Sequence, residues 1–251
     1  MKTFDIVIGN GCSFTQGGGL NNVKIHEFLT GESVKDLIKL DAYMFKNAYP
    51  AFLGKLLNCK WYNNSVSCAS NDLIVQRGMD IVKQFRNKKT LIINQLSIPS
   101  RMGFRKGNKY FSFNSLDGKL VYNDTENGIK NPHHRPHSIF KKNELDEFYK
   151  KYVLDVYDMN AYWKDFTYTM ELFNAWCEKN NILNYWITYV NHEHISHIDR
   201  VIEIDSYDGM CEWSERKQLQ LKHIKNIPVD DSHLSIEGHK QLANIIYEKI
   251  R

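Results

Sequence analysis

Residues 4–15 read FDIVIGNGCSFT, and this stretch decides the fold class of the chain. Its first five residues form a short, mostly apolar run of the kind that becomes a buried strand. Gly9, Asn10 and Gly11 end that run at once, which predicts a tight loop at the carboxyl end of the strand. Ser13 lies in this loop among small residues, so a substrate can approach its hydroxyl closely and backbone N–H groups stay free.

The rest of the chain alternates between strand-like and helix-like segments. Their residue types and spacing predict strands over 60–64, 90–96 and 183–190. Apolar residues at helical spacing predict helices over 49–57, 71–86, 145–156, 162–179 and 235–250, the last with Ser235 as its N-cap. Such alternation is typical of a parallel sheet with helices on both faces. We therefore expect an α/β fold, a three-layer α/β/α sandwich around a central parallel sheet.

Residues 102–142 interrupt this alternation. They are polar and rich in Gly, Asn and His. Inside them, residues 109–113 and 119–122 alternate like the arms of a hairpin around Asp117-Gly118. We expect a single domain over 1–251 with an inserted flap at about 102–142. The flap follows the third strand, so its root should lie at the carboxyl edge of the sheet, near Ser13.

Composition excludes several classes of function. The 251 residues carry 33 Lys and Arg against 29 Asp and Glu, and a net charge of +4 is too small to indicate nucleic acid as a partner. No apolar stretch approaches the ~18 residues of a membrane helix, and the first apolar run is too short for a secretion signal. Five cysteines without a CxxC pair fit reduced thiols. We expect a cytoplasmic protein without a nucleic-acid or membrane partner. Composition gives no oligomeric state.

A second group of reactive side chains lies near the other end, where Asp230-Asp231-Ser232-His233 precedes the last predicted helix. A nucleophilic serine needs a base within hydrogen-bond reach, and the base needs a carboxylate that orients it. An aspartate three residues before a histidine can meet the imidazole across one turn. We expect Asp230 to hold one ring nitrogen of His233 while the other faces Ser13. The ordinary alternatives are a histidine at the start of a helix with a local hydrogen bond, and Asp231 facing water.

The two ends together resemble the SGNH (GDSL-type) hydrolase superfamily. Its first block is a Gly-Asp-Ser loop after strand one, and its last is Asp-x-x-His before the C-terminal helix. Here these blocks read GCS at residues 11–13 and DDSH at residues 230–233. The version GCSFT resembles a variant seen in bacterial and phage proteins. Residues 63–71 (NNSVSCASN) and 95–101 (QLSIPSR) stand where the second and third blocks lie.

The resemblance implies a flavodoxin-like serine esterase or deacetylase that needs no cofactor and acts on a small acyl ester, such as an O-acetylated carbohydrate. It implies an oxyanion hole built from the N–H groups of Ser13 and Cys68, helped by Asn71 or Ser97. Three positions depart from the family pattern. Cys12 replaces the usual Asp, Cys68 stands at the usual Gly, and Ser97 is the nearest counterpart of an absent Asn. Loss of one oxyanion donor lowers turnover by ~10²–10³.

Those departures keep other functions open. A catalytically idle binding or assembly module with this fold, in a phage or surface-polysaccharide system, is the main alternative, with a virion-associated location. An acyltransferase with an acceptor other than water would use the same residues. Cys12 is a further candidate nucleophile, although no histidine lies near it in sequence. A phosphate-binding loop is disfavoured because the Lys-Ser/Thr ending of a P-loop is missing.

Other side chains have ordinary interpretations. Two histidine groups lack a recognised metal-ligand spacing, so we expect no metal: His192, His194 and His197, and His133, His134 and His137. Arg101 and Arg105 are candidates for gripping an anionic substrate, with surface charge as the default. The aromatic run Tyr162, Trp163, Phe166 and Tyr168 is predicted to belong to the core and the helix face.

Overall fold

Four parallel strands form the central sheet of the computed structural model, in the order β2-β1-β3-β7. Their bounds are Ile6–Asn10 for β1, Lys60–Asn63 for β2, Thr90–Gln95 for β3 and Leu183–Ile187 for β7. The structure describes residues 3–20, 42–67, 69–99, 101, 103–106, 109–113, 120–123, 151, 158–188, 195–205, 209–224 and 232–251. Every residue of β1 and β3 is buried, as expected for strands covered on both faces. Strands β2, β3 and β7 confirm the strands predicted over 60–64, 90–96 and 183–190, and their ends differ from the predicted ones by a few residues at most.

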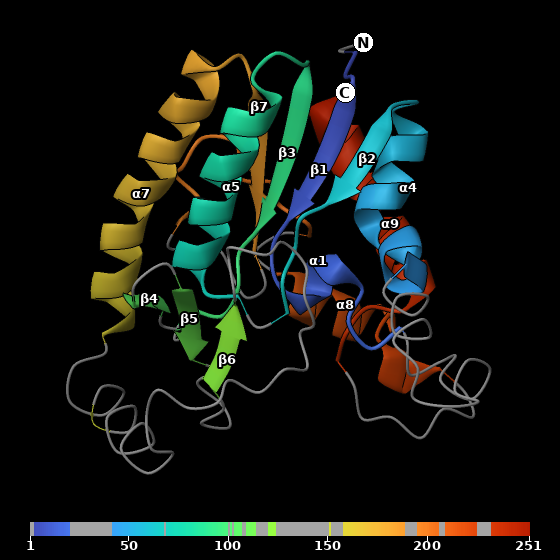
Figure 1. Cartoon of the computed structure of the whole chain (residues 1–251). Helices are drawn as coiled ribbons and strands as arrows, with labels where there is room; N and C mark the ends of the chain where they lie inside the picture. Colours follow the sequence, from blue (N-terminus) through green and yellow to red (C-terminus); the bar gives the residue numbers. More distant parts are fainter. Residues whose placement is uncertain are drawn as a thin grey trace.

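The register places the carboxyl ends of the strands at one edge of the sheet. β1 pairs with β2 from Ile6↔Lys60 onward, and it pairs with β3 as far as Asn10↔Asn94. In Figure 1 the strands run in one direction, and the short helix α1 (Ser13–Gln16) lies just beyond their carboxyl ends. The chain segment that follows each strand is therefore brought to the same side of the molecule.

Helices cover both faces of this sheet, which confirms the predicted three-layer sandwich (Figure 1). The bounds are Tyr49–Leu56 for α4, Asn71–Phe85 for α5, Met159–Lys179 for α7 and Ile236–Ile250 for α9. Strand β1 shows how the faces differ, because its successive side chains point to opposite sides. Val7 packs in the core with residues of α4 and α9, whereas Ile6 and Ile8 pack in the core with residues of α5 and α7.

Polar side chains fix where three of these helices begin. Ser70 accepts a hydrogen bond from Leu73 N and caps α5. Ser235 accepts one from Gly238 N and caps α9, as predicted from the sequence. Asp158 caps α7, so this helix begins at Met159 rather than at the predicted residue 162. Residues 42–47 are helical as well, and the connections hold α8 (Met210–Arg216) and a short 3₁₀ helix, η3 (Leu221–His223). The helix expected over 145–156 lies almost wholly outside the described residues.

The inserted segment contains a small antiparallel sheet of its own, in the order β4-β5-β6. Its strands are Gly103–Lys106 (β4), Lys109–Phe113 (β5) and Leu120–Asn123 (β6). The pairing of Phe111 with Tyr122 confirms the predicted hairpin, whose turn residues Asp117-Gly118 lie outside the described residues. Strand β4 was not predicted, because GFRK is too short and polar to show strand periodicity. Figure 1 places this sheet at the same end of the molecule as α1.

Within the parts of the chain that the structure describes, none of the helices combines the length and the apolar character needed to cross a bilayer.

Candidate active site

Ser13 is held in a tight turn immediately after β1. Ser13 is the first residue of α1, and the backbone of Cys12 before it is extended. The N–H groups of Thr15 and Gln16 both donate hydrogen bonds of 3.1 Å to the Cys12 carbonyl, and these bonds close the turn. The Ser13 side chain is buried, with 7% of its surface exposed. These bonds fix the backbone of Ser13 and therefore the position of its Cβ atom.

His233 approaches Ser13 from the far end of the chain. Its Nε2 atom lies 2.8 Å from Ser13 Oγ, although the two residues are 220 positions apart. The imidazole stacks on the ring of Phe14, with centroids 4.4 Å apart and planes at 27°. The backbone carbonyl of His233 accepts a hydrogen bond of 2.8 Å from Leu221 N. The backbone and the ring of His233 are therefore both fixed with Nε2 directed at the serine hydroxyl.

Gly18 gives the imidazole the space that it needs. A Cβ atom at this position would lie 3.0 Å from His233 Cδ2, from His233 Nε2 and from the Ser13 carbonyl oxygen. Gly18 N also donates a 2.7 Å hydrogen bond to that carbonyl, so the glycine cannot move away freely. A side chain here would push the imidazole from Ser13.

We expect Gly18→Val to lower kcat of any reaction that uses the contact between Ser13 and His233 by about 10- to 10²-fold, because a displacement near 1 Å of a reacting group has an effect of that size. Gly18→Ala should show a smaller loss in the same direction. Initial rates and Tm measured on both variants check this. A valine variant that keeps the parental kcat would show that Gly18 does not set the position of His233.

The remaining triad and oxyanion candidates are not all described. Asp230, Asp231 and Cys68 lie outside the described residues, so a carboxylate partner for His233 and a second backbone N–H donor stay predictions. For Nε2 to accept a hydrogen bond from Ser13 Oγ, the neutral imidazole must carry its hydrogen on Nδ1. That nitrogen is the one that Asp230 is predicted to hold.

Gln95, which the sequence analysis gave no role, ties the end of β3 to the serine turn. Its Oε1 atom accepts hydrogen bonds from Cys12 Sγ and Thr15 Oγ1, both at 3.1 Å, and from Cys12 N at 3.4 Å. Cys12 is 1% exposed, and its thiol faces this amide. Among the described residues, the imidazole of His233 contacts the Ser13 hydroxyl, and Cys12 is used as an anchor of the turn.

Buried asparagines at the ends of the strands support the same turn. Asn10 Nδ2 donates to Asn94 Oδ1 and to the Ile74 carbonyl, both at 2.8 Å. Asn64 Nδ2 donates to Asn10 Oδ1 at 3.1 Å, and Asn63 Nδ2 donates to the Thr15 carbonyl at 2.8 Å. These bonds join the ends of β1 and β2 to the serine turn and to β3, while the buried Nδ2 of Asn94 has no hydrogen-bond partner among the described residues. The signal in the sequence is an asparagine at or beside the end of β1, β2 and β3.

The structure brings Asn71 and Ser97 together, and their role at an oxyanion hole stays a prediction. Ser97 N donates to Asn71 Oδ1 at 2.7 Å. Asn71 Nδ2 donates to the phenol oxygen of Tyr162 at 2.9 Å and to the Ser97 carbonyl at 3.4 Å. Arg101, 8% exposed, donates from Nη1 to Ser97 Oγ at 2.6 Å. The Asn71 amide thus holds the backbone of Ser97 in place.

The other aromatic residues of the predicted run divide between core and surface. Trp163 and Phe166 are 4% exposed and belong to the core between α7 and the sheet, as expected. Tyr168 is 58% exposed and lies on the outer face of α7. The side chain of Arg105 lies outside the described residues.

A second histidine, His239 of α9, lies fully buried behind the site. Its Nδ1 accepts a 3.3 Å hydrogen bond from Tyr49 N, and its ring stacks on that of Tyr49 with centroids 6.5 Å apart. Burial, with a smaller contribution from the charge of His233, lowers the pKa of His239 to about 3. It is therefore neutral at physiological pH. Sequence reasoning missed it because it occupies a position on the apolar face of a helix.

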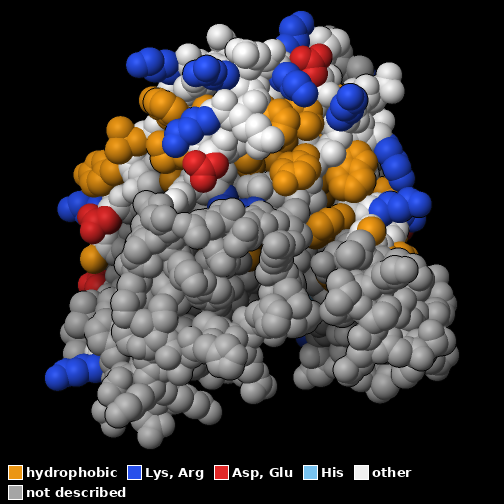
Figure 2. Space-filling view, in the orientation of Figure 1, with side chains coloured by type: hydrophobic (Ala, Val, Ile, Leu, Met, Phe, Trp, Pro, Cys, Tyr) orange, Lys and Arg blue, Asp and Glu red, His pale blue; other side chains and the backbone are white. Residues whose placement is uncertain are grey.

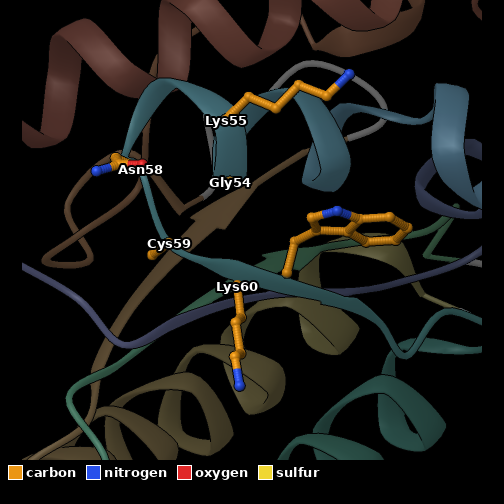
Figure 3. A pocket seen from close by; sticks show the side chains of 6 residues that line it. Gly54, Lys55, Asn58, Cys59 and Lys60 are labelled. Atoms are coloured by element: carbon orange, nitrogen blue, oxygen red, sulfur yellow. The ribbon is translucent and has the colours of Figure 1, made fainter.

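Two surface hollows lie away from this site. The larger, about 680 Å³, is lined by Gly54, Lys55, Asn58, Cys59, Lys60 and Trp61. It lies at the amino end of β2, opposite the edge that carries Ser13. Figure 3 shows Lys55 and Lys60 extending in different directions, so they do not converge on one ligand. The smaller, about 530 Å³, is lined by residues of α5 together with Thr169 of α7. Figure 2 shows lysine and arginine side chains spread over the upper end of the molecule with apolar side chains between them.

In the described parts of the chain, no three His, Cys, Asp or Glu side chains are placed to hold a metal ion. Of the histidines in the two predicted groups, His197 is described and exposed. The other five lie outside the described residues.

Comparison with known proteins gives only distant likenesses. No family model and no curated protein matches the chain. A solved structure described as a lipolytic protein of the G-D-S-L family, from Desulfitobacterium hafniense DCB-2, is 12% identical over 97% of this chain and 98% of its own, with a TM-score of 0.36. A carbohydrate esterase, whose active site is described as having divergent catalytic and non-catalytic binding functions, is 13% identical over 100% of this chain and 69% of its own, with a TM-score of 0.42. Likenesses at this level decide nothing about activity, which has to be argued from the geometry of Ser13 and His233.

Proposed function

We propose that the protein is a serine hydrolase of the SGNH (GDSL) type that cleaves a small acyl ester. The observation that carries this proposal is the 2.8 Å contact between Ser13 Oγ and His233 Nε2 at the carboxyl edge of a parallel sheet. A nucleophile and a base within hydrogen-bond reach are the minimum arrangement for acyl transfer through an acyl-enzyme.

The chemistry follows from these two side chains. Ser13 Oγ attacks the ester carbonyl while His233 Nε2 takes the hydroxyl proton, and the imidazolium then gives that proton to the leaving alcohol. Water, activated by the same nitrogen, releases the acid and restores Ser13. Asp230 is the residue that we assign to hold His233 Nδ1. The oxyanion is assigned to the N–H groups of Ser13 and Cys68, with Asn71 and Ser97 at the side.

The substrate class that we propose is a small acyl ester, including O-acetylated carbohydrate. The flap of β4 to β6 lies at the same end of the molecule as Ser13, so we infer that it borders the cleft and shapes substrate choice (Figure 1). Loops at this edge of an α/β sheet are where ligands bind in such folds. We expect neither a nucleic acid nor a membrane as partner.

Labelling with a serine-directed phosphonate tests the proposal directly. The probe should attach to the purified protein, and mass spectrometry of the digest should place the adduct on the peptide that contains Ser13. Attachment at another serine, or none, would contradict the assignment and favour an idle binding module.

Activity should need no added metal. The proposed reaction uses only side chains and backbone N–H groups, and dialysis against a chelator should leave kcat unchanged. Loss of hydrolysis that zinc or another divalent ion restores would contradict a metal-free mechanism.

A further inference from the structure

Ser97 follows β3 as Ser13 follows β1. Asn10 and Asn94 are partners in the β1–β3 register, and each serine lies three residues after its asparagine. The two turns are also joined directly, since Gln95 of β3 bonds to Cys12 and Thr15 beside Ser13. Both serines therefore belong to adjoining turns at the carboxyl edge of neighbouring strands.

The hydroxyl proton of Ser97 is directed by its other contacts. The N–H and carbonyl groups of Ser97 are both bonded to Asn71, at 2.7 and 3.4 Å. Ser97 Oγ accepts from Arg101 Nη1 at 2.6 Å, and a guanidinium only donates. The hydroxyl proton must therefore serve a different acceptor, and none of the residues that the structure describes accepts it. Ser97 therefore presents a buried donor that is fixed in place and has no acceptor among the described residues.

Arg101 brings a positive charge to that donor. Its side chain is 8% exposed, its Nε is enclosed without a hydrogen-bond partner, and no carboxylate among the described residues pairs with it. A buried cation without a partner is strongly destabilising. Such a charge becomes favourable when negative charge develops close by, which is the situation in the tetrahedral intermediate of ester hydrolysis.

We propose that Arg101 is a positioning residue that orients and polarises the Ser97 hydroxyl, so that this hydroxyl donates to the oxyanion formed when Ser13 attacks an ester. A hydroxyl that accepts a charge-assisted hydrogen bond becomes a stronger donor itself. The pair supplies a side-chain donor at the position where Ser97 stands in place of the expected Asn. This inference rests on the proposed esterase function and adds Arg101 to its machinery.

A double-mutant cycle tests whether Arg101 acts through Ser97. Ser97→Ala, Arg101→Gln and the double variant are assayed on a neutral aryl acetate and on an aryl ester that carries a carboxylate. Each single change should lower kcat on both esters by about 10²-fold, as for loss of one oxyanion donor, with KM nearly unchanged. The double variant should be no slower than Ser97→Ala, because Arg101 has no other route to the oxyanion. Ser97→Thr keeps the hydroxyl and should stay near the parent.

Four outcomes would overturn the inference. Losses that multiply in the double variant would show independent roles. A rise of KM confined to the charged ester would show that Arg101 binds an anionic group of the substrate. An active parent with unchanged kcat in Arg101→Gln would remove Arg101 from the machinery while leaving the esterase proposal intact. If Arg101→Gln does not fold, Arg101→Met completes the cycle, because methionine removes the charge and the donors while filling much of the same space. A parent that neither hydrolyses these esters nor takes up a phosphonate would overturn the esterase proposal, and this inference with it.

Discussion

Replacing Ser13 with alanine is expected to lower ester hydrolysis by at least about 10³-fold and to leave the fold intact. The change removes Oγ, which is the proposed attacking atom and the partner of His233 Nε2. Loss of a nucleophile of this kind removes several orders of magnitude of turnover, and the remainder comes from binding and the oxyanion hole. The backbone contacts of the turn, including the 2.7 Å bond from Gly18 N to the Ser13 carbonyl, do not involve the deleted atom.

The measurement is kcat on a short-chain aryl ester, with Tm and the circular dichroism spectrum taken on the same samples. Ser196→Ala is a matched control, because Ser196 is an exposed serine. The control should keep both activity and phosphonate labelling. Parental turnover in purified Ser13→Ala would end the esterase proposal, whatever the stability of the variant.

Acid is expected to destabilise the protein through His239. The pKa of this buried imidazole is lowered to about 3, whereas a histidine in the unfolded chain titrates near 6.5. Below pH ~6.5 the unfolded state therefore binds a proton that the folded state does not, and the free energy of unfolding falls as the pH falls. From pH 7 to pH 5 this single group should remove about 2 kcal/mol, with further loss down to about pH 3.

The variant His239→Asn isolates this contribution. An asparagine oxygen can accept the hydrogen bond from Tyr49 N that His239 Nδ1 accepts, and it does not titrate. The variant should be less stable than the parent at pH 7, because it leaves unfilled space, yet its stability should change less between pH 7 and pH 5. Urea unfolding at both values gives the comparison, with exposed His197→Asn as control. Equal pH dependence in parent and His239→Asn would show that His239 is not the acid-sensitive group.

The layers of the fold were predictable because they depend on local patterns. The run of residues 4–8, the β-branched strands and the amphipathic last helix each carry their own periodicity, so the α/β/α sandwich followed from the sequence. The contact between Ser13 and His233 was expected because a serine nucleophile needs a histidine base and because the GCS and DDSH blocks together resemble those of the SGNH superfamily.

Other parts of the site depend on contacts that the sequence does not signal. The bond from Arg101 to Ser97 joins residues four apart in a turn, and surface charge was the default interpretation of that arginine. The sequence does not distinguish His239 from other polar residues of a helix, because its burial depends on the packing of α4 against α9. Gln95 is the last residue of the buried strand β3, and its amide oxygen accepts hydrogen bonds from Cys12 and Thr15 in the turn that contains Ser13.

The separation of 220 positions between Ser13 and His233 has a consequence for biosynthesis. Strand β1 leaves the ribosome early, yet it lies between β2 and β3 and cannot complete its ladders until residue 95 has emerged. His233 and α9 follow much later, and contacts of such high sequence separation form slowly. Ser13 is therefore synthesised long before His233, and the contact between them forms only after α9 has docked. For the proposed esterase, turnover would report on completed folding of this region rather than on the amount of chain synthesised.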